Sequence, residues 1–414
     1  MADKPKILVA GAGTMGNSIA HVFAAHGYVT YMSSRHQESL DKAQESIDAA
    51  LALLKAEGMA DDAYEAALRE NLHPIRNDAI GDIAQEIDVV FETIVEDPDA
   101  KRDFYSMLSG QCRADCILAS NTSGMDIFTV CEGVVDNMER LIIAHWFNPP
   151  HLMKLVEVVC GPKTSDSTAC RIRELLEAVG RKPAVLSTFV PGFIVNRLAT
   201  VINRELYYMI DQGWISAQDA EDAIKYTHGL RFGFEGPLEL WDFVGLKTTM
   251  AVAHEGVLDS LCNDTDTLPL GDKLVSEGKT GVAAGEGVLK YGDIKEYAEK
   301  RSHRVVQMTK IVEEWDREDA RDASSDSDQQ TGSVQIDVSM PSPILPDPMA
   351  GQFEMSEEDL GEFSVGDVAC ISCRPLCTNK VMRRYHGGPL FMCTRKEATK
   401  QILEREYARM HPDA

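Results

Sequence analysis

The sequence contains no run of about 18 apolar residues, the length a helix needs to cross a bilayer, so no transmembrane segment is expected. We also expect no signal peptide, because the apolar run that follows the N-terminus covers only residues 7–10. We find no internal repeat. These absences exclude the membrane-spanning and repeat classes, and they predict a cytoplasmic location.

Positive charge is scarce, since 41 Lys and Arg stand against 66 Asp and Glu, for a formal net charge of −25. Nucleic-acid-binding proteins usually show the opposite balance, so we expect no nucleic-acid partner. Residues 316–367 hold 14 acidic and 2 basic residues with many Ser and Pro, which predicts an acidic linker. Residues 1–315 still hold 48 acidic and 30 basic residues, so an anionic ligand would need a local positive site.

Cysteine is too sparse for a secreted disulfide framework, with ten residues spread over 414. Four of the ten gather in the basic segment 368–414. They are Cys370, Cys373, Cys377 and Cys393. A CxxC pair with further Cys or His residues can bind structural zinc in a reducing compartment. Buried free thiols and a redox pair are the alternatives.

The first part of the chain alternates short β-rich apolar runs with amphipathic helical stretches. The runs that we interpret as buried strands are 7–10, 29–33, 88–93, 116–120, 141–145, 155–159 and 184–187. This alternation predicts an α/β fold, a doubly wound and mostly parallel Rossmann-type sheet over residues 1–189. Helical patterns dominate residues 190–315 and predict an all-helical second domain. A helix–turn–helix arm is expected at residues 55–71.

A glycine-rich motif, GAGTMG, follows the first predicted strand and opens a helix. Gly11 would allow the tight turn, Gly13 would let the backbone approach a pyrophosphate, and Gly16 would let the helix pack against the sheet. The N–H groups of the helix start, including those of Thr14 and Met15, would face the phosphates. The motif therefore predicts a dinucleotide site; a plain strand–helix turn is the alternative.

An acidic residue usually ends the second strand of such a site and binds the ribose hydroxyls, but this sequence has Ser33, Ser34 and Arg35 there. An arginine beside serines can pair with a 2′-phosphate. NADP is therefore a competitor to NAD. In the other interpretation, Arg35 is exposed and only stacks on the adenine.

Histidine is the natural base for removing a hydroxyl proton near neutral pH. His145 is expected at the carboxyl end of a strand, which is the edge where doubly wound sheets bind ligands. Glu157 lies in the next strand, from which it could accept a hydrogen bond from the second ring nitrogen. A structural histidine is the alternative.

Four segments together resemble the L-3-hydroxyacyl-CoA dehydrogenase family. They are SNTS (120–123), AHWFNPP (144–150), MKLVEVV (153–159) and PGFIVNR (191–197). The resemblance covers about residues 5–290 and leaves out the last hundred or so. It implies a dehydrogenase that oxidises an L-3-hydroxyacyl-CoA with NAD or NADP and pairs into a homodimer through its helical domain.

The resemblance also implies residue roles. His145 is the general base and Glu157 its partner. Ser123 hydrogen-bonds the reacting oxygen, Asn148 orients the histidine or the substrate, and Asn196 holds the substrate. Each of these could instead be a turn former or a structural residue.

Glu96 and Lys101 match a stretch of the family that lines the nicotinamide, although a solvated helix start would look the same. The predicted arm carries Lys55 and Arg69 among several acids, without a clear basic cluster. Two alternatives therefore stay open: the same chemistry on a non-thioester 3-hydroxy acid, and a nucleotide-binding regulatory or assembly protein.

Overall fold

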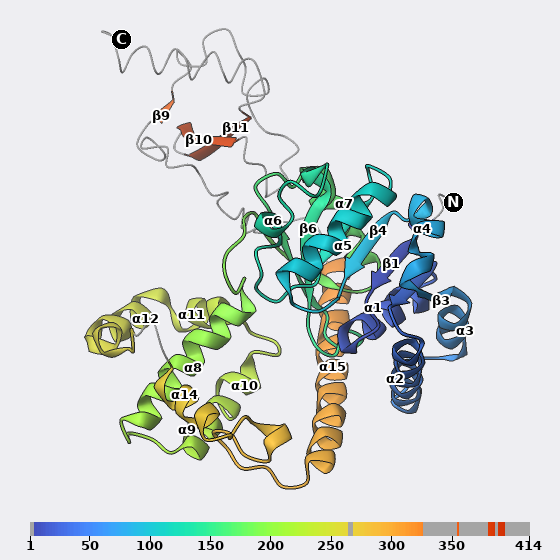
Figure 1. The fold of residues 1–414 in the computed structure, drawn as a ribbon. Coiled ribbons are helices and arrows are strands. Elements are labelled where there is room, and N and C mark those ends of the chain that lie inside the picture. Colours follow the sequence, from blue (N-terminus) through green and yellow to red (C-terminus); the bar gives the residue numbers. More distant parts are fainter. Residues whose placement is uncertain (1–3, 264–267, 326–353, 356–379, 386–387, 394–414) are drawn as a thin grey trace.

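Figure 1 shows the computed structural model, which describes residues 4–263 and 268–325 and three short strands near the C-terminus. The first part is built on an eight-stranded sheet with the order β3-β2-β1-β4-β5-β6-β7-β8. Its strands are β1 (Ile7–Ala10), β2 (Thr30–Ser34), β3 (Leu72–Arg76), β4 (Val89–Glu92), β5 (Ile117–Ser120), β6 (Leu141–Trp146), β7 (Leu155–Cys160) and β8 (Lys182–Leu186). All neighbours pair in parallel except β6 and β7, which are antiparallel.

Helices cover both faces of this sheet. They are α1 (Thr14–Ala25), α2 (Gln37–Ala56), α3 (Asp62–Asn71), α4 (Ile80–Ile83), α5 (Pro98–Gln111), α6 (Ile127–Val130) and α7 (Asp166–Ala178). One core packs α1, α2 and α7 against the sheet, and a second core packs α4, α5 and α6 against the other face. The predicted doubly wound Rossmann-type fold is therefore confirmed. β3 was not predicted, because its proline interrupts the strand signal; it lies at the sheet edge, where proline is tolerated.

The second part is helical, as predicted. It contains α8 (Val195–Asp211), α9 (Ala217–Lys225), α10 (His228–Arg231), α11 (Pro237–Val244), α12 (Leu246–Val252), α13 (Leu258–Ser260), α14 (Pro269–Ser276) and α15 (Ile294–Ser325). Residues 238–261, which lie within the predicted helical region, do not form one continuous helix. The chain breaks at Gly245 and again at Gly256, whose φ angles are +95° and +93°. Such angles suit glycine and end regular helix.

α15 returns from the helical part to the sheet domain (Figure 1). Its Val306 is fully buried against Leu54 of α2 and Leu152. The helix was expected to end at residue 315, yet it continues to Ser325, so ten residues of the predicted linker are helical. Asp316 explains part of this, since its carboxylate accepts hydrogen bonds from Lys154 at 3.4 Å and Lys182 at 2.7 Å.

Near the C-terminus, β9 (Glu354–Met355), β10 (Lys380–Tyr385) and β11 (Gly388–Cys393) form a small sheet with the order β11-β10-β9. The rest of the predicted linker and of the basic segment lies outside the described residues. No helix in the described part of the chain is long and apolar enough to cross a membrane.

Candidate active site

The glycine-rich loop joins β1 to α1, and its three glycines face different surroundings. Gly11 has a φ of +116°, and a Cβ there would lie 2.6 Å from the carbonyl oxygen of Thr93. A Cβ on Gly16 would lie 1.8 Å from the carbonyl oxygen of Gly11. A Cβ on Gly13 would meet no atom within 4 Å. Packing therefore explains the first and third glycines, whereas the second borders open space.

That open space lies over the N-terminus of α1. No side chain caps this helix start, where Gly13 is the N-cap and Thr14 and Met15 follow in the first turn. Free N–H groups together with the positive end of the helix dipole suit a pyrophosphate. The residues present thus fit the phosphates of a dinucleotide.

The end of β2 offers no carboxylate to a ribose. Ser33 is buried and its hydroxyl has no hydrogen-bond partner among the described residues. The hydroxyl of Ser34 accepts a hydrogen bond from the His36 N–H at 3.4 Å, and Arg35 is exposed. The predicted departure from the acidic pattern therefore corresponds to a polar, cationic edge beside the loop.

A buried polar network lies at the end of β4, beside the glycine loop. Lys101 of α5 is only 1% exposed, and its ammonium lies 2.7 Å and 2.8 Å from the two carboxylate oxygens of Glu92. Ser120 and Tyr105 also donate hydrogen bonds to Glu92, at 2.7 Å and 3.3 Å. Burial raises the pKa of Tyr105 well above its usual value, and the Glu92 charge adds to that effect.

The solvated helix start that was weighed for Lys101 is therefore wrong. Its ammonium also lies 3.0 Å from the half-exposed carboxylate of Glu96, which in turn accepts a hydrogen bond from the Thr122 hydroxyl. Sequence reasoning missed Glu92 because the residue closes an apolar strand. A carboxylate at a strand end beside the glycine loop was the available signal.

His145 and Glu157 face each other on β6 and β7. The antiparallel register pairs them directly, and Nδ1 of His145 lies 2.8 Å from Oε2 of Glu157. Glu157 is fully buried and His145 is 5% exposed. The hydrogen-bond partner at Nδ1 leaves Nε2 as the ring nitrogen available to a ligand.

The second oxygen of Glu157 is held by the start of α8. Oε1 accepts hydrogen bonds from the N–H groups of Ile194 and Val195, both at 2.8 Å. Burial would by itself raise the pKa of Glu157, but the hydrogen bonds from His145 and these two N–H groups outweigh it and lower the pKa. Glu157 is thus held as a carboxylate.

Aromatic rings enclose the histidine. The ring centroids of Phe147 and Phe193 lie 4.6 Å and 5.6 Å from that of His145. Phe193 has a φ of +50°, which is uncommon for a bulky residue, and it immediately precedes the two N–H donors to Glu157. Backbone strain at this point therefore accompanies the contact between the helical part and the dyad.

The remaining predicted site residues lie around this pair. Asn196 donates a hydrogen bond to the Ser123 carbonyl at 3.0 Å, which joins α8 to the segment after β5. Ser123 and Asn148 are exposed. Asn121, which was not singled out, accepts a hydrogen bond from the Trp146 N–H at 2.8 Å and so anchors the end of β6.

The predicted zinc ligands are not assembled in the described part of the chain. Cys393 ends β11, whereas Cys370, Cys373 and Cys377 lie outside the described residues. Among the residues that the structure does describe, no group of three or more His, Cys, Asp or Glu side chains is placed to hold a metal ion.

Comparison with known proteins agrees with this architecture. Residues 6–188 match the 3-hydroxyacyl-CoA dehydrogenase NAD binding domain, and residues 192–291 match the C-terminal domain of the same family. A probable 3-hydroxybutyryl-CoA dehydrogenase of Deinococcus radiodurans is 35% identical over 292 residues, or 69% of this chain and 100% of the relative.

A second relative is named for a different substrate. It is the 5-formyl-3-hydroxy-2-methylpyridine 4-carboxylate 5-dehydrogenase of Mesorhizobium japonicum, 30% identical over 310 residues, which cover 74% of this chain and 98% of the relative. A solved structure of an enzyme with this activity, described as NAD+-dependent, aligns with a TM-score of 0.69, at 29% identity and over 75% of this chain and 99% of that one.

The solved (S)-3-hydroxybutyryl-CoA dehydrogenase of Ralstonia eutropha aligns with a TM-score of 0.59 and 28% identity, over 70% of this chain and all of that one. Both domain models together cover most of the described chain. The protein belongs to the 3-hydroxyacyl-CoA dehydrogenase family and is an NAD-dependent oxidoreductase.

Proposed function

We propose that the protein oxidises the 3-hydroxyl group of an L-3-hydroxyacyl-CoA to the 3-oxo group, reversibly. The observation that carries this proposal is the buried pair of His145 and Glu157 at the ligand-binding edge of the sheet. The names of the 3-hydroxybutyryl-CoA relatives support the thioester as substrate.

In the proposed reaction, Nε2 of His145 removes the proton of the substrate hydroxyl while the bond between C3 and its hydrogen breaks. NAD, when bound, supplies the acceptor of the hydride. The C3–O bond becomes a carbonyl, and His145 becomes an imidazolium that the Glu157 carboxylate stabilises. In the reverse direction, the same imidazolium returns the proton to the oxygen.

The other predicted residues would position the substrate. The Ser123 hydroxyl would donate a hydrogen bond to the reacting oxygen, and Asn148, on the loop after β6, would orient the histidine or the substrate. Asn196 would hold the substrate from the helical side. The hydrogen bond from Asn196 to the Ser123 carbonyl supports a shared site for these two residues.

For the cofactor, we propose that the N–H groups after Gly11 and Gly13 bind the pyrophosphate, and that Glu96 and Lys101 line the nicotinamide side. Arg35 and Ser34 would bind the 2′-phosphate of NADP, which makes NADP a second candidate cofactor. Arg35→Ala should weaken NADPH binding and spare NADH in calorimetric titrations. Equal effects on both cofactors would remove the argument for NADP.

A non-thioester 3-hydroxy acid is the second candidate substrate. It is favoured by the relative named for a pyridine carboxylate, whose match is longer than that of the 3-hydroxybutyryl-CoA relatives, at 310 residues against about 290. Both candidates use the same dyad and differ only in what carries the hydroxyl group.

The test follows nicotinamide absorbance with acetoacetyl-CoA and with acetoacetate, each with NADH and with NADPH. We expect NADH to be consumed with the thioester at a much higher kcat/KM than with the free acid. Turnover of the acid alone would establish the second candidate, and turnover of neither would contradict both.

We also propose a homodimer formed through the helical part. α8 buries none of its residues in the single chain, and Leu198, Val201 and Ile202 on it are 42–52% exposed. Contiguous exposed apolar surface of this kind marks an interface.

A zinc ion on the four C-terminal cysteines stays a prediction. Metal analysis of the purified protein should find about one zinc per chain, as a four-ligand structural site requires.

A further inference from the structure

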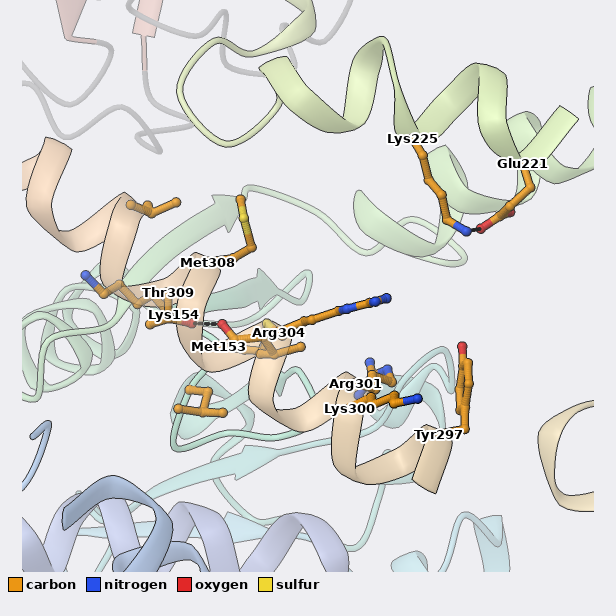
Figure 2. A pocket seen from close by; sticks show the side chains of 13 residues that line it. Met153, Lys154, Glu221, Lys225, Tyr297, Lys300, Arg301, Arg304, Met308 and Thr309 are labelled. Carbon is orange, nitrogen blue, oxygen red and sulfur yellow. Dashed lines mark hydrogen bonds and ion pairs between the residues drawn. The ribbon is translucent and has the colours of Figure 1, made fainter. Parts of the chain in front are cut away.

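A second cavity, separate from the dyad, lies between α9, α15 and the loop that precedes β7. Its volume is about 540 Å³, which is within the range of small-molecule sites. None of the residues proposed for the chemistry lines it. Arg301 and Arg304 of α15 both line it; Figure 2 shows Arg304 extending from α15 into the gap, with Lys225 and Glu221 of α9 on its other side.

The lining combines cations with apolar side chains. The cationic members are Lys154, Lys225, Lys300, Arg301 and Arg304, against the single acid Glu221. The apolar members include Leu152, Met153, Val305, Met308 and Val312. A chain with a net charge of −25 thus concentrates positive charge at one concave, partly apolar place. This is the kind of local positive site that an anionic ligand of an acidic protein requires.

Three of these cations form ion pairs with carboxylates, and two do not. Lys225 pairs with Glu221 at 3.1 Å, Lys300 pairs with Glu296, and Lys154 pairs with Glu313 at 3.3 Å. Among the described residues, no carboxylate pairs with Arg301 or Arg304. A guanidinium presents several N–H donors in one plane and binds phosphate through two parallel hydrogen bonds. The free pair is therefore suited to phosphate oxygens.

In the helix–turn–helix arm, in contrast, both cations are already in ion pairs with carboxylates. Lys55 pairs with Asp62 at 2.9 Å and with Glu65 at 2.6 Å. Arg69 pairs with Asp48 at 2.5 Å and with Glu65 at 3.7 Å. α15 also packs against this arm, because Met59, Ala60 and Tyr64 join the apolar cluster that buries Val306. Phosphate recognition at the arm would have to break existing ion pairs, whereas recognition by Arg301 and Arg304 would not.

The cavity is connected to the dyad through one hairpin. His145 is on β6, Glu157 is on β7, and Leu152, Met153 and Lys154 in the connection between them line the cavity. Tyr297 adds a half-exposed aromatic ring at the cavity wall, on which a base could stack. The α15 side of the cavity, with Arg301 and Arg304, lies beyond residue 291, where the family match ends, whereas the residues of α9 and of the loop before β7 lie within the matched domains.

We propose that this cavity binds the phosphate groups of an adenine nucleotide, with Arg301 and Arg304 as the phosphate-binding residues. Two ligands carry this chemistry. The first source is the 3′-phosphorylated ADP end of a coenzyme A thioester, and the second is a free adenine nucleotide. The first source rests on the proposed function, because it requires the substrate to be a thioester. The second does not.

Calorimetric titration with adenosine 3′,5′-bisphosphate tests the cavity without any turnover. The native full-length protein should bind the probe, and Arg301→Gln combined with Arg304→Gln should weaken binding at least about tenfold, since each charge-assisted hydrogen bond contributes on that order. Arg317→Gln is the matched control, because Arg317 is exposed on the same helix but does not line the cavity. It should leave the affinity unchanged.

No binding of the probe to the native protein, or equal affinity in the double variant and the native protein, would overturn the proposal. Because both arginines are exposed and unpaired, thermal melting of the double variant should match that of the native protein. Kinetics with 3-hydroxybutyryl-CoA then distinguish the two sources. A raised KM with unchanged kcat in the double variant identifies the thioester tail, and an unchanged KM with weakened probe binding identifies a free nucleotide.

Failure of the proposed function would look different. If no thioester is turned over but the probe binds and the double variant weakens that binding, the cavity is a nucleotide site and the assigned substrate is wrong.

Discussion

The sheet domain and the helical part contribute to one site but are stabilised in different ways. The sheet domain buries its apolar side chains on both faces and also buries charged groups that are paired with each other, such as Glu92 and Lys101. Of the 25 large apolar side chains that are exposed among the described residues, 24 follow residue 193. The first domain is thus complete within one chain, and the second presents apolar surface that another surface must cover.

This difference teaches where each function is placed. The dyad is fixed by two strands of the sheet domain. The helical part contacts it through the backbone N–H groups of Ile194 and Val195, which donate hydrogen bonds to Glu157. Chemistry should therefore respond to substitutions in β6 and β7. Assembly should respond to substitutions on α8 and α11.

Among substitutions around the base, the largest effect is expected from Glu157→Gln. A neutral amide has no charge to stabilise the imidazolium, and its NH2 group can turn to Nδ1 and select the wrong tautomer, so kcat should fall by about 10³–10⁴-fold, as for the acid of a Ser-His-Asp triad. Steady-state kinetics with a 3-hydroxyacyl-CoA would measure this. A kcat within a few-fold of the native value would show that the pair is only structural.

The stability of the sheet domain should depend strongly on Lys101. Lys101→Ala leaves the buried carboxylate of Glu92 without its countercharge, and loss of one partner of a buried pair costs about 3–5 kcal/mol in the free energy of unfolding. Urea denaturation would measure it. The control is Lys300→Ala, which breaks an exposed pair on α15 and should cause no comparable change. Similar losses in both variants would contradict the comparison.

Stability should also fall with acid because of two buried histidines in the sheet domain. Burial, together with the charge of His151, lowers the pKa of His21 to about 3, and burial lowers the pKa of His151 to about 4. Unfolded histidine binds its proton below about pH 6.5, so the unfolded state gains protons first as the pH falls. The stabilisation is complete above that pH and is lost as the pH falls from there toward 4.

The slope should approach about 1.4 kcal/mol per pH unit for each histidine. His21→Phe, which keeps an aromatic ring in the buried space, should reduce this slope in denaturation curves recorded between pH 7 and pH 5. His254→Gln, on the exposed helical side, should not change it. An unchanged slope in the His21 variant would show that its burial has no linkage to folding.

The smallest effect on folding, and the clearest on assembly, is expected from Phe243→Asp. This side chain is 83% exposed on α11, so a charge there should weaken the proposed dimer and leave unfolding of the sheet domain unchanged. Sedimentation velocity would follow the shift to monomer. Thr248→Asp adds the same charge in the adjacent helix at an exposed position that is already polar, and should leave the dimer intact. A native protein that is monomeric would contradict the proposal.

Much of the fold follows from local pattern. Buried strands and amphipathic helices alternate clearly up to residue 187, and the glycine spacing identifies the loop whose geometry the structure bears out at Gly11 and Gly16. Local pattern carried these features because each depends on neighbours in sequence. The pair of His145 and Glu157 was expected from their places on consecutive strands and from the family resemblance, and the antiparallel register of β6 and β7 sets the two residues opposite each other.

Other features depend on distant contacts, so no local pattern reveals them. Lys101 looks like a solvated residue at a helix start until β4 brings Glu92 beneath it. α15 extends past its predicted end at residue 315, where Asp316 forms ion pairs with Lys154 and Lys182 of the sheet domain. The cationic cavity joins residues around 154, 225 and 301, which no spacing rule connects.

The central claim is that His145 is the general base of the reaction, and one variant tests it most directly. His145→Gln should lower kcat by at least about 10²-fold, the lower end of what general-base catalysis contributes, while the Kd of NAD measured by calorimetry stays unchanged. A variant that keeps a near-native kcat would contradict the account, because the proton would then leave by another route.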